Sequence, residues 1–362
     1  MEYPIDLPGG AQLSTKSICD ALSRHKEEGF EAVAVCPELL QNKLSDYGFR
    51  IRSYKMGENR LVNLLYRIAA FKKIIAEENP DLIHIEMSES LITYGFIRNL
   101  FSKIPYLYTD RGMYYGYRTR SKLFMMPVLN KASALVTTTD KNRKLWEDNS
   151  RVRPVVTIPN TITDSFAVYD EGRKKKGGRF AIGFAGRICV EKDWPFVPLL
   201  IKAFNDAGID FEVHLVLSLF EKGDDLQAEE LKRKIEDIIG AERLKFFTEL
   251  SQDQMSDFYY DIDLFVMTSR FESFGKAAVE AMSRSCSVIS TEVGGLPEVI
   301  GKDENLYTKD NIQKAVNYLK ELTENPEKLE RDRRYFLERY RANYTADAYL
   351  KRHLELYRRV LS

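Results

Sequence analysis

Short apolar runs alternate along the chain with longer segments in which apolar residues recur every three or four positions. The short runs are typical of buried strands, and the longer spacing is typical of amphipathic helices. We therefore predict strands at 31–35, 82–86, 105–109, 134–138, 155–158, 180–185, 211–217, 244–247, 263–267 and 287–290. We predict helices at 13–28, 61–78, 195–207, 226–239, 275–284 and 310–323. Strands that alternate with helices indicate an α/β protein whose parallel sheets carry helices on both faces.

The alternation breaks at 166–178, a polar stretch that contains glycine and a run of basic residues. This composition is typical of an interdomain linker. We therefore expect an N-terminal α/β domain over 1–165 and a C-terminal α/β domain over 179–345, each built around a doubly wound parallel sheet. A charge-rich helix over 346–362 is expected to pack back towards the N-terminal domain.

The length of 362 residues and the 44% share of hydrophobic residues agree with two folded domains. No apolar run approaches the roughly 18 residues that span a bilayer, and the first residues lack the basic and apolar regions of a signal peptide. We therefore expect a cytoplasmic protein that lies at most on the cytoplasmic face of a membrane. Only residues 1–3 precede Pro4, where a doubly wound domain needs its first strand, so either that strand is short or the true start lies upstream.

The 54 basic and 54 acidic residues give a formal net charge of zero, which argues against binding to nucleic acid through bulk charge. The four cysteines are far apart and predict neither a disulfide framework nor a zinc site. Charge is nevertheless unevenly distributed, because residues 98–131 carry a net charge of +6 with tyrosine, phenylalanine and methionine interleaved. Two interpretations are open for this stretch: a solvated basic loop, or an acceptor site that also touches an anionic bilayer.

The segment 270–300 carries the most informative chemistry. The predicted strand 263–267 leads into a turn with Glu272, and the helix that follows begins near Gly275. The backbone N–H groups and the dipole at the start of a helix favour a bound anion. Glu280 follows Glu272 with seven residues between, a separation of up to roughly 12 Å along a helix. This span suits a nucleotide sugar, which has hydroxyl groups at both ends and phosphates between them.

Two further segments contribute groups suited to a diphosphate. The predicted strand 180–185 is followed by Gly186, Arg187 and, five residues on, Lys192. Arginine offers bidentate hydrogen bonds to phosphate, and lysine offers a compact charge. Gly10, in the loop that opens the first helix, lets the backbone approach a ligand closely.

Together these motifs resemble glycosyltransferase family 4, the retaining enzymes of the GT-B fold. The resemblance covers nearly the whole chain and rests on five motifs: GGA at 9–11, IPN at 158–160, GR and K within 186–192, Glu-x7-Glu at 272–280 and GGLPE at 294–298. It implies two doubly wound, Rossmann-like domains that face each other across a cleft. It also implies a nucleotide-sugar donor held mainly by the C-terminal domain and an acceptor held mainly by the N-terminal domain.

The resemblance implies a role for each matching residue. Arg187 and Lys192 would neutralise the donor diphosphate as the glycosidic bond breaks, and Glu272 would touch the transferred sugar. The other donor-binding residues would be Gly10, Gly186, Phe274, Gly275, Lys276 and Glu280, with Glu280 on the ribose hydroxyls. In this family the leaving phosphate is thought to deprotonate the acceptor, so catalysis rests on positioning and charge stabilisation. No cofactor is expected.

The chain departs from the family pattern near the expected acceptor site. Where a histidine is common after a strand of the N-terminal domain, this chain has Arg111, with Asp110 beside it. We expect the acceptor to be bound by Asp110, Arg111, Tyr114, Arg118 and Arg120. A glycine-rich turn that is common near the nucleobase is also absent after strand 211–217, so UDP and GDP donors both remain open.

The pair Asp261 and Asp263 resembles the metal-binding D-x-D of other glycosyltransferases, but it precedes its strand and so lies at the wrong end of the sheet. We therefore expect a structural role for it and no metal. The function predicted is retaining transfer of a sugar from a UDP- or GDP-sugar to a glycan, a lipid-linked or a polyanionic acceptor, in cell-surface polysaccharide biosynthesis. The alternatives are a catalytically silent homologue that binds glycans or serves as a scaffold, and another enzyme of this fold such as a nucleotide-sugar epimerase.

Overall fold

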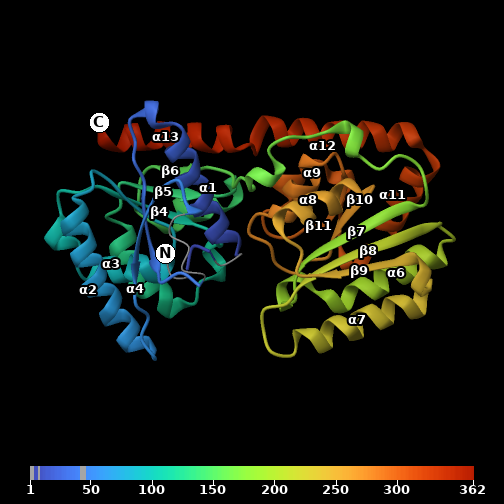
Figure 1. The fold of residues 1–362 in the computed structure, drawn as a ribbon, viewed down its shortest axis with the longest axis horizontal. Coiled ribbons are helices and arrows are strands. Elements are labelled where there is room, and N and C mark those ends of the chain that lie inside the picture. Colours follow the sequence, from blue (N-terminus) through green and yellow to red (C-terminus); the bar gives the residue numbers. More distant parts are fainter. Residues whose placement is uncertain (1–3, 7–8, 41–45) are drawn as a thin grey trace. The chain divides into compact units, whose positions relative to one another are not determined.

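The computed structural model describes residues 4–6, 9–40 and 46–362, which form two compact units. The first unit comprises the described part of Met1–Ile162 together with Ala346–Ser362, and the second comprises Thr163–Thr345. The final helix, α13 (Ala346–Leu361), therefore belongs to the first unit. Figure 1 shows the elements of each unit.

The second unit is built on one sheet of six parallel strands. Its strands are β7 (Phe180–Arg187), β8 (Phe211–Ser218), β9 (Leu244–Thr248), β10 (Leu264–Met267), β11 (Ser287–Thr291) and β12 (Leu306–Tyr307). They lie in the order β12-β11-β10-β7-β8-β9, so the strand order reverses between β7 and β10. In a doubly wound sheet, ligands bind beyond the carboxyl ends of the strands at this reversal.

Helices cover both faces of the six-stranded sheet (Figure 1). They are α6 (Val197–Asp206), α7 (Asp224–Ile239), α8 (Gln252–Tyr260), α9 (Lys276–Ser283), α10 (Leu296–Ile300), α11 (Gln313–Glu324) and α12 (Pro326–Asn343). Ile182 and Phe184 of β7 share a buried cluster with apolar residues of α6, α7 and α11. On the opposite face of β7, at Gly183, the backbone lies against Phe258 of α8. Helices α9 and α12 pack on each other, and α8 also contacts α9.

The expected linker at 166–178 packs into the second unit. The Phe166 side chain is fully buried, and the buried ammonium of Lys174 donates hydrogen bonds to the carbonyl oxygens of Tyr259 (3.1 Å) and Ile262 (2.6 Å). These bonds satisfy backbone carbonyls around the carboxyl end of α8, so a basic residue in this stretch has an interior role. The boundary between the compact units lies at 162/163.

The first unit contains two separate parallel sheets in the described residues. Their strands are β1 (Val33–Pro37) with β2 (Arg50–Tyr54), and β3 (Ile83–Ile85), β4 (Tyr106–Asp110), β5 (Ala134–Thr137) and β6 (Val155–Thr157). The pattern of apolar residues did not predict β2, because its Arg50 and Arg52 form ion pairs with Glu78. The missing first strand was expected at residues 1–3, which lie outside the described residues.

Helices of the first unit form two layers. They are α1 (Gly10–Arg24), α2 (Arg60–Glu78), α3 (Ser88–Gly95), α4 (Thr119–Leu129) and α5 (Asp140–Asn149), with α13 at the end of the chain. Buried residues of α1 and α13 share one cluster with Leu107 and Val136 of the sheet. Buried residues of α2, α3, α4 and α5 share a different cluster with Tyr106, Tyr108 and Leu135. Because successive strand residues point to opposite faces, the two clusters lie on opposite sides of the four-stranded sheet.

Candidate functional site

The candidate site lies beyond the carboxyl ends of β7 and β10, where the strand order reverses. Gly186 and Arg187 end β7, and a short 3-10 helix, Val190–Lys192, follows. The turn after β10 carries Glu272. Lys192 Nζ lies 2.6 Å from a carboxylate oxygen of Glu272, and the two side chains are 21% and 18% exposed. The structure therefore joins two of the predicted catalytic residues in one accessible ion pair.

Hydrogen bonds to backbone carbonyl oxygens hold the two loops together. The Thr268 hydroxyl donates to the carbonyl oxygen of Lys192 at 2.9 Å, and the Arg270 backbone N–H donates to that of Glu191 at 2.7 Å. Lys192 and Glu272 thus have their backbones fixed relative to each other before any ligand binds. Preorganised charges of this kind stabilise a transition state without reorganising during the reaction.

Asp193, which sequence reasoning missed, anchors the same loop. Its backbone is left-handed (φ 52°, ψ 51°), a conformation that aspartate tolerates better than most residues. Its buried carboxylate pairs with Arg270 (2.7 Å) and with Lys309. Burial raises the pKa of Asp193, but the hydrogen bonds from Arg270 and Lys309 outweigh burial and lower it overall. Little in the sequence indicated this anchoring role, because an aspartate that follows a lysine is common and marks no known motif.

Two glycines set the position of the Glu272 turn. A Cβ at Gly294 (φ 56°) would lie 1.8 Å from the Glu272 carbonyl oxygen, which accepts a hydrogen bond from Gly295 N–H at 2.9 Å. A Cβ at Gly275 (φ 103°) would lie 2.6 Å from the Leu296 side chain. Both positions therefore require glycine, and the GGLPE motif at 294–298 acts as the support on which Glu272 rests.

Arg187 and Phe274 lie near this pair but differ in exposure. The exposed guanidinium of Arg187 lies 5.8 Å from the centre of the Phe220 ring. The Phe274 side chain is buried and packs edge-on against the Tyr344 ring at 5.8 Å. Phe274 can therefore reach a ligand only through its backbone, as the family resemblance implies.

Helix α9 carries two further predicted donor-binding residues. Lys276 is its first residue, and Glu280 lies one turn further on. Burial raises the pKa of Glu280 to about 7, although the charge of Lys276 and a hydrogen bond from the Tyr259 hydroxyl (3.1 Å) oppose that rise. Glu280 therefore titrates near neutral pH, unlike an ordinary surface glutamate.

Gly10 belongs to the first unit, unlike the other predicted donor-binding residues. It is the first residue of α1, and its carbonyl oxygen accepts a hydrogen bond from the Ser14 hydroxyl at 3.0 Å. The Ser14 hydroxyl also lies 3.5 Å from the side-chain oxygen of Asn160, in the IPN motif. The motifs at 9–11 and 158–160 therefore meet in the structure of this unit.

Arg111 is held inside the first unit. It donates to Glu86 (2.7 Å), to the Tyr349 hydroxyl of α13 (2.9 Å) and to Asn160. Its guanidinium thus joins the ends of two strands to α13. We had expected Arg111 to bind an acceptor. In the structure its guanidinium instead makes hydrogen bonds within the first unit.

The structure contradicts an acceptor-binding role for Asp110. Its carboxylate is fully buried and accepts hydrogen bonds from Trp146 Nε1 (2.6 Å), the Tyr117 hydroxyl (2.6 Å) and Asn142 Nδ2 (2.9 Å). The backbone N–H of Gly112 also donates to it at 2.9 Å. A carboxylate that accepts four hydrogen bonds from the fold has no room for a ligand, and its charge is satisfied by the fold. The sequence did not reveal these donors because Tyr117 comes from the loop between β4 and α4, and Asn142 and Trp146 come from α5.

The remaining predicted acceptor residues lie closer to the surface. The Tyr114 ring is half-buried against Trp146, at 4.9 Å between ring centres, and Lys122 Nζ lies 3.7 Å from its centre. Arg118 and Arg120 are exposed at the start of α4. Of the five expected acceptor residues, these two arginines are the exposed ones in the described structure.

The Asp261 and Asp263 pair lies at the amino end of β10, away from the candidate site. Asp263 accepts a hydrogen bond from Ala181 N–H at 2.8 Å and pairs with Arg333 at 2.5 Å. These contacts give Asp263 a structural role. Among the residues described, three or more His, Cys, Asp or Glu side chains do not gather in a group able to hold a metal ion.

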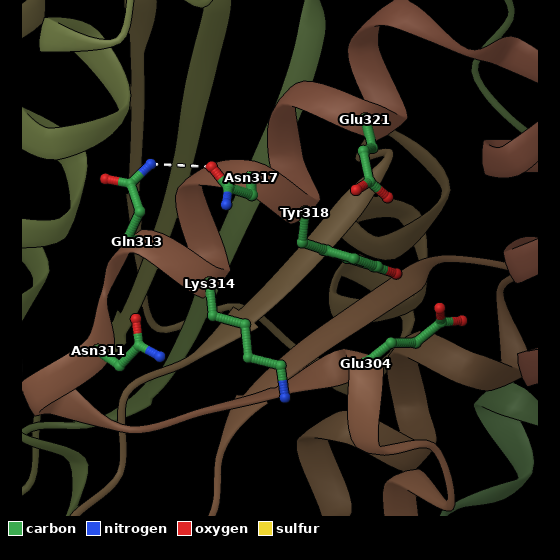
Figure 2. A pocket seen from close by; sticks show the side chains of 7 residues that line it. All are labelled: Glu304, Asn311, Gln313, Lys314, Asn317, Tyr318 and Glu321. Carbon is green, nitrogen blue, oxygen red and sulfur yellow. Dashed lines mark hydrogen bonds between the residues drawn. The ribbon is translucent and has the colours of Figure 1, made fainter.

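Two surface pockets lie in the second unit. The larger, about 390 Å³, is lined by polar residues of α11 and the loops before it, and Figure 2 shows Lys314 and Gln313 beside it. It contains none of the predicted site residues. The smaller, about 270 Å³, lies at the carboxyl ends of β10, β11 and β12 and includes Arg270 and Lys309, the partners of Asp193. It therefore borders the candidate site. No helix within the described ranges has the length and apolar character needed to cross a membrane.

Two family descriptions match the chain in succession. Residues 8–166 match Glycosyltransferase Family 4, and residues 168–337 match Glycosyl transferases group 1. A glycosyltransferase of Methanocaldococcus jannaschii is 27% identical over 316 residues, which cover 80% of this chain and 84% of that protein. The 2-deoxystreptamine glucosyltransferase of Streptomyces kanamyceticus is 32% identical over 131 residues, which cover 36% of this chain and 32% of that protein.

Solved structures show the same fold over almost the full chain. Sucrose-phosphate synthase from Thermosynechococcus elongatus superposes with a TM-score of 0.82 at 18% identity, covering 97% of this chain and 94% of that one. The Anabaena protein HepE, solved in complex with UDP, superposes with a TM-score of 0.78 at 17% identity, covering 98% and 97%. The prediction of two Rossmann-like α/β domains of the GT-B fold is confirmed.

We predict that Asp110→Ala destabilises the first unit by about 3 kcal/mol, because the substitution leaves the buried indole N–H of Trp146 without an acceptor and removes the shorter of the two hydrogen bonds donated by Asn142 Nδ2. Urea unfolding followed by fluorescence in a Trp194→Phe background measures this, since Trp146 then reports the first unit alone. Asp148→Ala, at an exposed position of α5, should shift the free energy of unfolding by less than about 0.5 kcal/mol. Equal stability of the two variants would contradict the role given to Asp110.

Proposed function

Because this chain belongs to glycosyltransferase family 4, we propose that it transfers a sugar from a UDP- or GDP-sugar to an acceptor with retention of the anomeric configuration. The acceptor class we propose is a glycan, glycolipid or polymer of cell-surface polysaccharide biosynthesis. One observation carries the donor assignment: the Lys192–Glu272 pair, at 2.6 Å, stands beyond the carboxyl ends of β7 and β10 at the reversal of strand order. The HepE structure, which has this fold and holds UDP, supports the same ligand class.

The two members of this pair suit opposite parts of the donor. Lys192 would bind the diphosphate, because an ammonium stabilises the negative charge that grows on the leaving group. Glu272 would accept hydrogen bonds from the sugar hydroxyls. In the absence of donor the two neutralise each other, so the arriving phosphate takes over the Lys192 charge and frees the Glu272 carboxylate for the sugar. Arg187, exposed at the end of β7, would add a bidentate contact to phosphate.

Helix α9 would contribute to donor binding at both of its turns. Its first residues offer backbone N–H groups and the positive end of the helix dipole to a phosphate. Glu280 would accept hydrogen bonds from the ribose hydroxyls, and the Tyr259 hydroxyl fixes its orientation. Phosphate and ribose are neighbours in a nucleotide, so one helix can hold both.

The proposed reaction breaks the bond between the sugar and the diphosphate and forms a bond from the same face of the sugar to the acceptor oxygen. The acceptor hydroxyl gives its proton to the leaving diphosphate, so protein groups only position the reactants and stabilise charge. The transition state has oxocarbenium character, as in glycoside hydrolysis. We propose that no metal takes part. The contacts of Asp263 with Ala181 and Arg333 support this, because they give the carboxylate of the D-x-D pair a structural role in place of metal binding.

The direct test incubates the protein with a panel of UDP- and GDP-sugars in EDTA and measures release of free nucleotide. Slow hydrolysis of one donor is expected, and that result identifies the donor. Lys192→Ala and Glu272→Ala should each lower this rate about 100-fold, because each removes charge stabilisation or sugar positioning. Product analysis with an added acceptor should show the anomeric configuration of the donor.

Matched controls come from the surface pair of Lys234 and Glu230 on α7, also 2.6 Å apart. Alanine at either position should leave the rate of donor hydrolysis unchanged. Absence of hydrolysis with every donor, combined with tight glycan binding, would indicate a silent homologue. Conversion of a donor into an isomeric nucleotide sugar would indicate an epimerase.

The affinity for the donor should rise with pH through neutrality. Ribose hydroxyls donate to an ionised carboxylate, and the pKa of Glu280 in the free protein is about 7. Glu280 is therefore mostly protonated at pH 6 and mostly ionised at pH 8, so the dissociation constant should fall by up to about tenfold over that interval. Calorimetric titration of the identified donor measures it. In Glu280→Gln the dissociation constant should change little between pH 6 and pH 8. A pH dependence equal to that of wild type would contradict the assignment.

Asp193 should act as a positioning residue for Lys192. Asp193→Ala removes the partner of Arg270 and Lys309, so the loop loses its anchor and kcat for donor hydrolysis should fall about tenfold. Asp193→Asn keeps the shape and tolerates the left-handed backbone, and it should recover part of that loss. Asp206→Ala, which breaks a surface pair with Lys202 at 2.8 Å, is the control. A wild-type kcat in Asp193→Ala would refute the role.

A further inference from the structure

Exposed apolar side chains are concentrated in one part of the first unit. Seventeen large apolar side chains are exposed in the described residues, and eight of them lie between residues 61 and 124. These eight are Leu61, Leu65, Tyr66, Phe96, Leu100, Tyr115, Leu123 and Phe124. Leu61 is 67% exposed and Leu123 is 70% exposed, so these are prominent side chains rather than partly covered ones.

Five of these side chains lie on α2 and α4, and Phe96 and Leu100 follow the end of α3. The buried residues of these helices, such as Phe71, Leu91 and Met125, pack against the same face of the four-stranded sheet. Helix α3 contacts both α2 and α4, so the three form a continuous layer (Figure 1). Since their inner faces all meet the sheet, their exposed residues lie on the outer side of that layer. We call this outer side, with the loop residues up to Lys131, the α2–α4 surface.

Basic residues surround the apolar side chains of the α2–α4 surface. Exposed cations on these helices and their loops are Arg60, Lys72, Lys103, Arg118, Arg120 and Lys131, and none of them pairs with an acid within the described residues. Two nearby acids are engaged by other basic residues: Glu78 pairs with Arg50 and Arg52, and Glu89 pairs with Arg67. The exposed acids Glu58 and Asp81 at the ends of α2 are fewer than the six exposed cations. The surface thus combines exposed apolar side chains with an excess of positive charge.

We propose that the α2–α4 surface docks the protein on an anionic lipid bilayer. Leucine and phenylalanine side chains of this kind enter the boundary between headgroups and acyl chains, and the basic residues contact the headgroups. Long lysine and arginine side chains can keep their charges at the headgroups while their stems cover apolar surface. Each basic residue near an anionic surface strengthens binding about fivefold.

Charge argues for a bilayer over a second copy of this chain. A symmetric pairing through the α2–α4 surface would place the excess positive charge of the two copies face to face, which is unfavourable. An anionic bilayer complements both the charge and the apolar side chains, and it adapts to a surface without a groove. The inference is independent of the proposed donor chemistry. Combined with it, docking would bring the enzyme to acceptors that are anchored in the membrane.

The test is flotation of the full chain with vesicles of phosphatidylcholine alone or with 30% phosphatidylglycerol. Wild type should bind the anionic vesicles, bind the neutral ones at least tenfold more weakly, and detach as salt rises. The double variant Leu123→Glu/Phe124→Glu should lose at least tenfold in affinity for the anionic vesicles. Arg118→Glu/Arg120→Glu should lose at least as much.

The matched control is Leu199→Glu/Leu226→Glu, at side chains 61% and 73% exposed on α6 and α7 of the second unit. It should bind the vesicles as wild type does. Donor hydrolysis in solution should be equal in wild type and Leu123→Glu/Phe124→Glu, which shows that the variant is folded and separates this inference from the proposed reaction. The proposal would be overturned if the wild-type protein did not bind anionic vesicles, or if it formed dimers through the α2–α4 surface instead.

Discussion

The pairing of β7 with β10 is the constraint on which the candidate site depends. These strands are far apart in the sequence, yet Ile182 and Gly183 lie in register with Leu264 and Phe265. Because both strands are parallel, their carboxyl ends open on the same edge, and the loops that follow them must diverge to opposite faces of the sheet. Lys192 and Glu272 meet where these two loops diverge.

Much of the fold could be predicted from the pattern of apolar residues. All ten predicted strands are present within a few residues of their expected bounds, because each forms a short, largely apolar run. Four of them, β4, β5, β10 and β11, are buried on both faces. Strand β2 was missed because its arginines face Glu77 and Glu78 of α2 rather than a core. Strand β12 was missed because it is only two residues long.

The chemistry of individual residues was harder to predict from sequence, since it depends on partners that are remote in the chain. Asp110 and Arg111 follow a strand, which is where ligand-binding residues often lie, but Trp146, Asn142 and Tyr349 reach them from other helices. Asp193 had no motif to mark it, and its role became visible only through Arg270 and Lys309. The motif residues Gly275 and Gly294 were recognised as part of a pattern, and the structure supplies the reason: neither position has space for a Cβ.

The central claim is that the nucleotide of the donor binds above β7 and β10. A crystal structure of the protein with the donor identified by hydrolysis tests it most directly. The account predicts diphosphate oxygens within hydrogen-bond distance of Lys192 Nζ and ribose hydroxyls against the Glu280 carboxylate. A nucleotide found instead in the polar pocket beside Lys314 and Glu321 (Figure 2), with the Lys192–Glu272 pair unchanged, would contradict it.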